Sequence, residues 1–479
     1  MLFDAIFAIH NGIMAVDKTQ YLSDKIRNMN ESATLKMAQK ARDLRAKGID
    51  VISLSLGEPD FDTPDHIKEA AKRALDDGFT KYTPVAGLPE LRKAICKKLK
   101  RDNDLDFSMN EIMVSNGAKQ SISNVFNALL NPGDEVIIFS PYWVSYHDIV
   151  KLAGGVVVPV KAGIEQDFKV TADQLDAAIT DKTKAIIFSS PCNPTGSVYQ
   201  YDELVALAEV IDKYDNLFVI ADEIYEYINF QSKHVSIGTF ESLKDQTITI
   251  NGFSKGFAMT GWRLGYMAGP EWLVKACGKI QGQCTSGANA FAQKAAVHAL
   301  EADMGPTMEM KAAFLKRKQL IRELLAEIPG ISCNDPEGAF YIFPNISALF
   351  GRSNGVSTIR NADDFAEIIL NEAHVAVVSG SAFGDDETNV VVVEFWVEFN
   401  KQNAFEEWKS LEGVTYYRVD IEKAPKAKKK YRIRMAPSIL IFKDGIVEES
   451  FKAGLDLELP TDLQELQETI NESKKANRF

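Results

Sequence analysis

The sequence predicts an α/β fold in which a mostly parallel sheet is covered by helices. The first observation is an alternation of short apolar segments with longer helical segments from Asp65 onward. This alternation is typical of parallel sheets, because each crossover between parallel strands needs a long connection, usually a helix. The second observation is that each apolar segment ends in polar or glycine residues. Ligands of such sheets bind beyond the carboxyl ends of the strands, so we expect the functional site there.

The elements are predicted in chain order. The segment from about Ser23 to Gly48 has helical periodicity and begins with a Ser-Asp cap, and VISLSLG at 51–57 is predicted to form a short strand. Five further strands are predicted in the segments EIMVSNG, DEVIIFS, TKAIIFSS, NLFVIADE and TITINGFS.

The pattern changes near residue 388, and we place a domain boundary at Asp386–Thr388. The β-branched run NVVVVEFWVEF predicts a strand that opens a second α/β unit. The elements predicted after it are a helix at about 402–412, a strand at 413–420, a helix at about 422–430, strands at 437–445 and 446–454, and a terminal helix.

Composition narrows the class of protein. The 479 residues carry a net charge of -13, which disfavours a nucleic-acid partner, and we interpret the basic run at 423–434 as a solvated helix and loop. No apolar run approaches ~18 residues, so we expect no membrane span.

The five cysteines form no C-x-x-C pair, so we expect a cytoplasmic protein without disulfides or a metal site. The first residues lack a positively charged region, so we expect no signal peptide and a start of translation at Met14.

A candidate covalent site lies in the segment SKGFAMTGWRLGY, directly after the last strand predicted before residue 388. A lysine that forms a Schiff base must be partly desolvated at a strand end so that its amine is nucleophilic, and Lys255 has such a position. Ser254 and Arg263 could hold a phosphate through a hydroxyl and a guanidinium group. Taken alone, Lys255 would be a surface lysine at the start of a helix, but its neighbours favour the covalent site.

The segment FVIADEIYEY brings Asp222 to the end of another predicted strand. An aspartate there could pair with a protonated pyridine nitrogen and keep the ring an electron sink, while Tyr225 could reach a phenolic oxygen of the ring. The simpler interpretation is an aspartate that caps the next turn. Its place 33 residues before Lys255 favours the first interpretation.

Three loops at other strand ends offer further ligands. Gly117, Ala118 and Lys119 lie between a strand and a helix, where free amides bind phosphate. Asn193, in SPCNPTG, could donate to a cofactor oxygen, and Trp143, in SPYWVSY, could stack on a flat heteroaromatic ring. For each loop alone, an ordinary turn or a core tryptophan remains the alternative.

Together these motifs resemble those of a known family. The segments that carry the resemblance are SLGEPDFDTP, KYTPVAGLPELR, NGAKQ, SPYWVSY, SPCNPTG, ADEIYE, SKGFAMTGWRLGY and GAFYIFP. Residues from about 21 to 385 resemble class I aminotransferases of the fold-type I pyridoxal-phosphate family, closest to the bacterial aspartate aminotransferases. The resemblance implies an N-terminal extension at 1–20, a small domain from 21–65 and 311–387, and a large cofactor-binding domain at 66–310.

The resemblance also implies roles for single residues. Lys255 would bind pyridoxal 5'-phosphate covalently and carry the proton. The other implied cofactor contacts are Asp222 on the pyridine nitrogen, Asn193 and Tyr225 on the ring oxygen, Trp143 on the ring face, and Gly117, Ala118, Lys119, Ser254 and Arg263 on the phosphate. Tyr82 matches a tyrosine that reaches the phosphate of a neighbouring subunit, which implies a homodimer. Gly57, together with Trp143 and Asn193, would contact the substrate.

The sequence departs from the family after Asp385. Members end the small domain with a strand whose arginine holds the substrate α-carboxylate, and this chain continues instead into the run at 389–399. Arg418, Arg432 and Arg434 stand in a different context, so we expect the anchor to be missing and the small domain to be truncated.

Residues 388–479 resemble a thioredoxin-like domain. Pro437 occupies the position of that fold's cis-proline, and Asn400 and Asn403 replace its two cysteines. Because disulfide exchange needs a thiolate, we expect no redox activity from this domain.

The resemblance implies ping-pong transamination of an amino acid, aspartate by overall likeness, with 2-oxoglutarate. Three alternatives stay open at this point: a protein that binds the cofactor with impaired or no catalysis, a ligand-sensing module, and a different reaction of the same cofactor. No helix-turn-helix segment is visible in the sequence, which disfavours the sensor.

Overall fold

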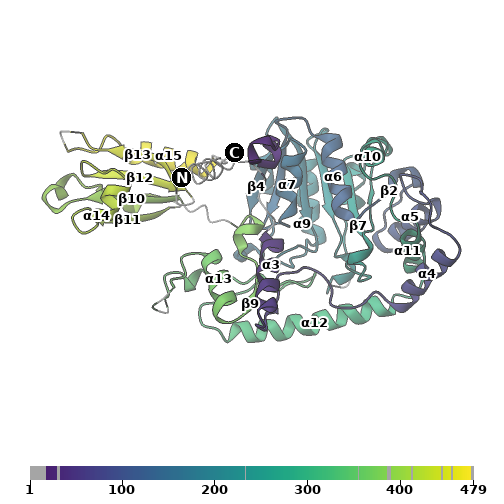
Figure 1. The fold of residues 1–479 in the computed structure, drawn as a ribbon. Helices are drawn as coiled ribbons and strands as arrows, with labels where there is room; N and C mark the ends of the chain where they lie inside the picture. The colour runs from purple at the N-terminus through teal and green to yellow at the C-terminus, as the bar shows by residue number, and fades with distance from the viewer. Residues whose placement is uncertain are drawn as a thin grey trace, which may run out of the picture. The chain divides into compact units, whose positions relative to one another are not determined.

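A computed structural model describes residues 18–27, 29, 33–231, 233–353, 355, 357–385, 390–411, 414–443, 446–454 and 457–475. The chain forms two compact units, residues 1–385 and 386–479 (Figure 1). The expected start at Met14 and the expected boundary at Asp386–Thr388 lie outside the described residues. Among the described residues, no helix is long and apolar enough to cross a membrane.

The first unit is built on a seven-stranded sheet with the strand order β2-β8-β7-β6-β5-β3-β4. Its strands are β2 (Ile112–Ser115), β3 (Glu135–Ser140), β4 (Val156–Lys161), β5 (Thr183–Ser189), β6 (Phe218–Asp222), β7 (Thr247–Gly252) and β8 (Gly265–Ala268). The five strands from β4 to β7 in this order run parallel, and β8 is antiparallel to both of its neighbours. The predicted mostly parallel sheet is therefore confirmed.

Two strands of this sheet were not predicted from the sequence. β4 contains Pro159, which has no N–H to donate, and β4 tolerates it because it lies at the edge of the sheet. β8 falls inside the segment SKGFAMTGWRLGY, which we interpreted only as a cofactor loop. The predicted strand at 51–57 shortens to β1 (Ile52–Ser53), which pairs in parallel with β9 (Val375–Ala376) in a separate two-stranded sheet.

Apolar side chains cover both faces of the large sheet. In β3, Val136 and Ile138 pack into one core cluster, while Ile137 and Phe139 pack into another. Successive side chains of a strand point to opposite faces, so these two clusters are the two layers between the sheet and its helices. All four residues are buried, which is why the parallel strands read as continuous apolar runs.

Helices surround the sheet and form the remaining layers (Figure 1). Those of the first unit are α2 (Asp24–Arg27), α3 (Ala33–Ala46), α4 (Asp65–Asp76), α5 (Pro89–Asn103), α6 (Ala118–Leu129), α7 (Ser145–Leu152), α8 (Ala172–Ala178), α9 (Tyr201–Ile211), α10 (Glu271–Cys284), α11 (Ala290–Glu301), α12 (Gly305–Ala326) and α13 (Ala362–Glu372). α3 and α13 pack beside β1 and β9, where Ala41, Val51, Leu370 and Ala376 make a small separate core.

The second unit has a four-stranded sheet with the order β11-β10-β12-β13. Its elements are β10 (Val390–Trp396), β11 (Thr415–Asp420), α14 (Pro425–Lys430), β12 (Ser438–Lys443), β13 (Ile446–Lys452) and α15 (Leu463–Lys475). β10 is parallel to β11 and antiparallel to β12, and the Ala436–Pro437 peptide is cis. The helix predicted at about 402–412 was wrong: two 3-10 helices, Glu398–Asn403 and Glu406–Ser410, take its place.

Candidate active site

The predicted site residues gather at the carboxyl ends of the central strands of the first unit. β5, β6 and β7 are adjacent and parallel, and Asp222, the last residue of β6, is in register with Ser189 of β5 and Ile250 of β7. Lys255 follows β7 by three residues, and Asn193 follows β5 by four. Because parallel strands end at one edge, segments far apart in the sequence meet here.

Lys255 is held close to the chain at Gly57. Its Nζ donates to the Gly57 carbonyl oxygen, and it lies 5.5 Å from the centre of the Tyr225 ring and 5.4 Å from that of Phe340. Burial lowers the pKa of the Lys255 amine to about 8, although the carboxylates of Glu58 and Asp222 oppose this shift. A larger share of this amine is therefore neutral, and so nucleophilic, near pH 7 than for an exposed lysine.

Asp222 is a buried carboxylate, 4% exposed, with both oxygens in contact with donors. Its Oδ2 accepts a hydrogen bond of 2.6 Å from the Tyr146 hydroxyl, and its Oδ1 accepts one of 3.3 Å from the Ile224 backbone N–H. Burial raises the pKa of Asp222 to about 6, while the two hydrogen bonds favour the charged form.

A positively charged cradle lies at the N-terminus of α6. Gly117 precedes the helix with a φ of 87°, and a Cβ atom there would lie 2.5 Å from the Arg263 guanidinium. Arg263 donates to the Thr260 carbonyl at 3.1 Å and the Asn116 carbonyl at 3.4 Å, so its charge stays beside the free amides of the helix. Desolvation and Arg263 lower the pKa of Lys119, because two cations lie close together here.

Other predicted ligands flank this cradle. Ser254 stands between β7 and Lys255. Trp143 precedes α7, and Lys119 Nζ lies 4.8 Å from the centre of its indole ring. The sequence reasoning thus placed Lys119 on the phosphate alone, whereas the structure also puts it over Trp143.

Tyr341 joins the site, although we had not singled it out. Its hydroxyl lies 2.5 Å from the Tyr225 hydroxyl and 3.3 Å from Asn193 Nδ2, which donates to it. A Cβ atom on Gly57 would collide with the same hydroxyl. GAFYIFP was recognised as a family segment, and its tyrosine, the one hydroxyl in that apolar run, was the signal that could have identified Tyr341.

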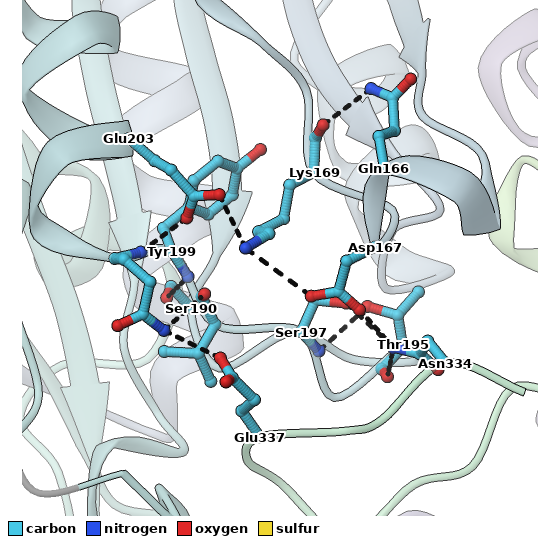
Figure 2. A network of polar contacts seen from close by, with 12 residues as sticks. Gln166, Asp167, Lys169, Ser190, Thr195, Ser197, Tyr199, Glu203, Asn334 and Glu337 are labelled. Atoms are coloured by element: carbon cyan, nitrogen blue, oxygen red, sulfur yellow. Dashed lines mark hydrogen bonds and ion pairs between the residues drawn. The ribbon is translucent and has the colours of Figure 1, made fainter.

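The loop that contains Asn193 is bonded to the segment before Tyr341, and Figure 2 shows Asn334 of that segment beside Thr195 and Asp167. Asn334 Nδ2 donates to the Thr195 carbonyl at 3.1 Å and to Asp167 at 2.8 Å, while the amides of Glu337 and Gly338 both donate to the Gly196 carbonyl at 2.9 Å. These bonds position the Asn193 amide and the Tyr341 hydroxyl relative to each other.

Tyr82 differs from the other predicted residues because its side chain is 96% exposed. It lies in the loop between α4 and α5. Within one chain the structure therefore gives Tyr82 no enclosed position.

A cluster of buried ionisable residues begins at Glu223, the residue that follows Asp222 in the sequence. Ligand-type atoms of Glu223, Glu226 and His234 lie within 4.8 Å of one another. The ammonium of Lys98 contacts Glu226 directly, and Asn103 donates to the same carboxylate at 2.7 Å. Burial opposes protonation of His234, but Glu223 at 3.1 Å outweighs it, so the pKa of His234 is raised. We interpret this cluster as an internal ion-pair network in which Lys98 supplies the cation.

Comparison with solved structures identifies the architecture of the first unit. The aspartate aminotransferase of Rhizobium meliloti superposes with a TM-score of 0.74 at 41% identity, covering 76% of this chain and 92% of that one. The aspartate aminotransferase of Thermus thermophilus with maleate gives a TM-score of 0.71 at 42% identity over the same shares. The first unit thus has the fold of type I pyridoxal-phosphate enzymes.

The sequence comparisons then give the family. Residues 49–390 match the model for aminotransferases of class I and II, so this chain belongs to that family. It is 48% identical over 367 residues to the aspartate/prephenate aminotransferase of Cereibacter sphaeroides, covering 76% of this chain and 92% of that protein. It is 46% identical over 366 residues to the aspartate aminotransferase of Geobacillus stearothermophilus, again over 76% and 92%.

Aminotransferases of this kind use pyridoxal phosphate. The residues present fit this group: the cradle at Gly117 is positively charged and has no side chain, a buried carboxylate stands at Asp222, and the amine of Lys255 has a lowered pKa. The expectation of this cofactor from the sequence is therefore confirmed.

Proposed function

We propose that this aminotransferase acts on aspartate, with 2-oxoglutarate as the acceptor, by a ping-pong mechanism. The arrangement of Lys255 and Asp222 at adjacent strand ends carries the proposal. The names of the relatives support the choice of aspartate, and they favour prephenate as a second 2-oxo acid. The maleate named with the Thermus thermophilus structure is a dicarboxylate, as aspartate is.

Each predicted residue has a defined task in this proposal. Arg263, Ser254, Lys119 and the amides of Gly117 and Ala118 hold the phosphate of the cofactor, and Asp222 pairs with its pyridine nitrogen. Asn193 and Tyr225 bind its ring oxygen, and Trp143 stacks on its ring. When bound, pyridoxal phosphate supplies an aldehyde that reacts with amines and a ring that withdraws electrons. Lys255 Nζ is the attachment point and then takes the proton from the substrate Cα.

Substrate binding uses fewer cations than in the family pattern. The described part of the first unit ends at Asp385, and Arg418 is engaged within the second unit by Glu394 at 2.7 Å. We propose that Gly57, Asn193 and Trp143 contact the substrate without the usual guanidinium anchor. Weak transamination, or cofactor binding with little turnover, is the alternative outcome.

We also propose the wider organisation that the sequence indicates. Residues 21–65 and 311–387 form a small domain, 66–310 the large domain, and 388–479 a thioredoxin-like domain without thiols. The strand order β11-β10-β12-β13 and the position of Asn400 beside Ala436 support the last assignment. We propose a cytoplasmic homodimer with shared sites. The exposure of Tyr82 supports the dimer, because a partner could enclose this side chain.

One experiment tests the proposed function directly. The full chain is loaded with pyridoxal phosphate and mixed with aspartate in the absence of a 2-oxo acid. A transaminase converts the band near ~420 nm to one near ~330 nm in proportion to the protein, and 2-oxoglutarate restores the first band. An unchanged spectrum with bound cofactor would leave a protein that binds the cofactor without transaminating.

A further inference from the structure

Tyr146 has a polar contact that its place in the core does not require. It lies in the first turn of α7, is 1% exposed, and packs in the same cluster as Ile138, Ile187 and Ile220. A phenylalanine would fill the same space, so packing alone does not explain the hydroxyl. That hydroxyl is aimed at Asp222 and donates to Oδ2 at 2.6 Å.

The surroundings connect Tyr146 to both neighbouring strand ends. Ser189 and Asp222 are register partners at the ends of β5 and β6, and the Ser189 side chain lowers the pKa of Tyr146, against the larger effect of burial. The Tyr146 ring meets the ring of Trp143 edge-on, with 5.5 Å between ring centres and 88° between planes. Residues 143–146 therefore bring an indole and a phenol to two different parts of one site.

We propose that Tyr146 is a positioning residue of this enzyme, which fixes the orientation and charge of Asp222 through its hydroxyl. This inference rests on the proposed role of Asp222 as the partner of the cofactor's pyridine nitrogen. With Oδ2 bound to Tyr146 and Oδ1 to the Ile224 amide, the carboxylate cannot rotate without breaking a hydrogen bond.

The same bond controls where the shared proton resides. A hydrogen bond to the charged form of a carboxylate stabilises that form and makes it a weaker base. Without the hydroxyl, Asp222 would be a stronger base and would compete better for the proton that it would share with the ring nitrogen. Transfer of the substrate Cα proton to Lys255 would then slow, while substrate binding would be unchanged.

Tyr146→Phe removes only the hydroxyl, and Tyr199→Phe is the matched control. Tyr199 is also buried, but its hydroxyl bonds to the backbone of Val170, at 2.7 Å and 3.2 Å, rather than to Asp222. In the loaded full chain, Tyr146→Phe is expected to lower kcat about tenfold, or about 1.4 kcal/mol, with KM for aspartate nearly unchanged. The isotope effect with aspartate deuterated at Cα should increase, whereas Tyr199→Phe should leave both kcat and the isotope effect as in the wild type.

A second readout needs no turnover. The dissociation constant of pyridoxal phosphate, measured on cofactor-free protein, should rise in Tyr146→Phe. In an Asp222→Asn background the same substitution should add nothing, because Tyr146 acts through Asp222. Additive effects, or a Tyr146→Phe protein that behaves like Tyr199→Phe in both readouts, would overturn the inference alone. Failure of the wild type to bind pyridoxal phosphate would overturn the proposed function and this inference with it.

Discussion

The two units differ in how the polar groups near the ends of their strands are satisfied. In the first unit, Asp222 is buried and Lys255 is half-buried, both with pKa values displaced toward neutrality, and the charge of Arg263 adds to the desolvation that lowers the pKa of Lys119. In the second unit, Asn400 is buried after β10 and donates to the carbonyls of Ala436 and Leu457 at 2.8 and 3.0 Å. Polar groups that protein atoms satisfy hold a fold together, whereas ionisable groups that have displaced pKa values and no ion-pair partner point to a ligand site.

Buried carboxylates show the same contrast. Glu394, at 0% exposure, receives Arg418 at 2.7 Å, the Tyr416 hydroxyl at 3.0 Å and the Phe405 amide at 2.8 Å. Asp222 accepts hydrogen bonds from two neutral donors and, among the described residues, forms no ion pair with a guanidinium or an ammonium group. The first carboxylate is neutralised within the protein, whereas the second is available for the pairing with the pyridine nitrogen that we propose.

The largest expected effect is that of replacing Lys255. Lys255→Ala should abolish covalent attachment of pyridoxal phosphate and transamination, because no other amine occupies the position that follows β7. Borohydride reduction of the wild type, followed by peptide mapping, should place the label on the peptide that contains Lys255. Label on another lysine would remove the central assignment.

The second-largest expected effect is that of replacing Asp222, the buried carboxylate without an ion pair. Asp222→Ala should leave the cofactor bound but lower kcat by two or more orders of magnitude, because the pyridine nitrogen would lose its charged partner. Each tenfold loss of kcat corresponds to about 1.4 kcal/mol of transition-state stabilisation. Steady-state kinetics of the loaded full chain measure this. Turnover close to that of the wild type would contradict the role of Asp222.

The displaced pKa of Lys255 gives a prediction in pH. In cofactor-free protein, the amine should react with an acylating reagent as pH rises through about 8, because the neutral form appears above the pKa. An exposed lysine would show this midpoint near ~10.4. Quantitative peptide mapping across pH values from about 6 to 11 measures the midpoint, with exposed lysines of the same digest as controls. A midpoint of Lys255 that coincides with theirs would contradict the burial argument.

The sequence predicted local features well where one strand and its following loop contain the signal. Apolar runs in the sequence predicted the strands β2, β3, β5, β6 and β7. Lys255 and Asp222 were predicted as site residues because they lie at or just after the ends of such runs. The roles proposed for these two residues remain predictions. β4 was missed because Pro159 is compatible with a strand only at an edge, and edge position is a property of the assembled sheet.

Contacts between distant segments were the part that the sequence could not supply. Tyr146 and Asp222 are 76 residues apart, and Tyr225 and Tyr341 are 116 apart. No periodicity encodes which of two strand ends a helix faces. The first of the two 3-10 helices that replace the predicted helix at 402–412 also depends on distant contacts, since Asn400 and Asn403 donate to the backbone carbonyls of Ala436 and Leu457.

The departure from the family after Asp385 gives a prediction of moderate size. Replacing residues 388–479 with the arginine-bearing terminal segment of a family member should raise transamination at least tenfold, or about 1.4 kcal/mol. The gain should appear in KM for aspartate as well as in kcat, because a bidentate bond to the α-carboxylate is restored. Kinetics of the replaced and the original chain measure it. An original chain as fast as an intact relative would mean that another group holds the carboxylate.

The smallest expected effect tests the second unit alone. Asn400→Ala leaves the Ala436 carbonyl without the amide that satisfies it, and a buried group without its partner costs about 1–3 kcal/mol. Calorimetry of the full chain should show a lower melting temperature for the transition of the second unit, while the transition of the first unit and its cofactor binding stay unchanged.

Asn403→Ala is the control: Asn403 bonds only to Leu457 among the described residues and is less buried, so the loss of stability should be smaller. The same proteins should not reduce a disulfide substrate such as insulin, because amides at 400 and 403 cannot form a thiolate. Thiol-dependent turnover assigned to the second unit, or a change in cofactor binding caused by Asn400→Ala, would show that this unit does more than satisfy its own polar groups.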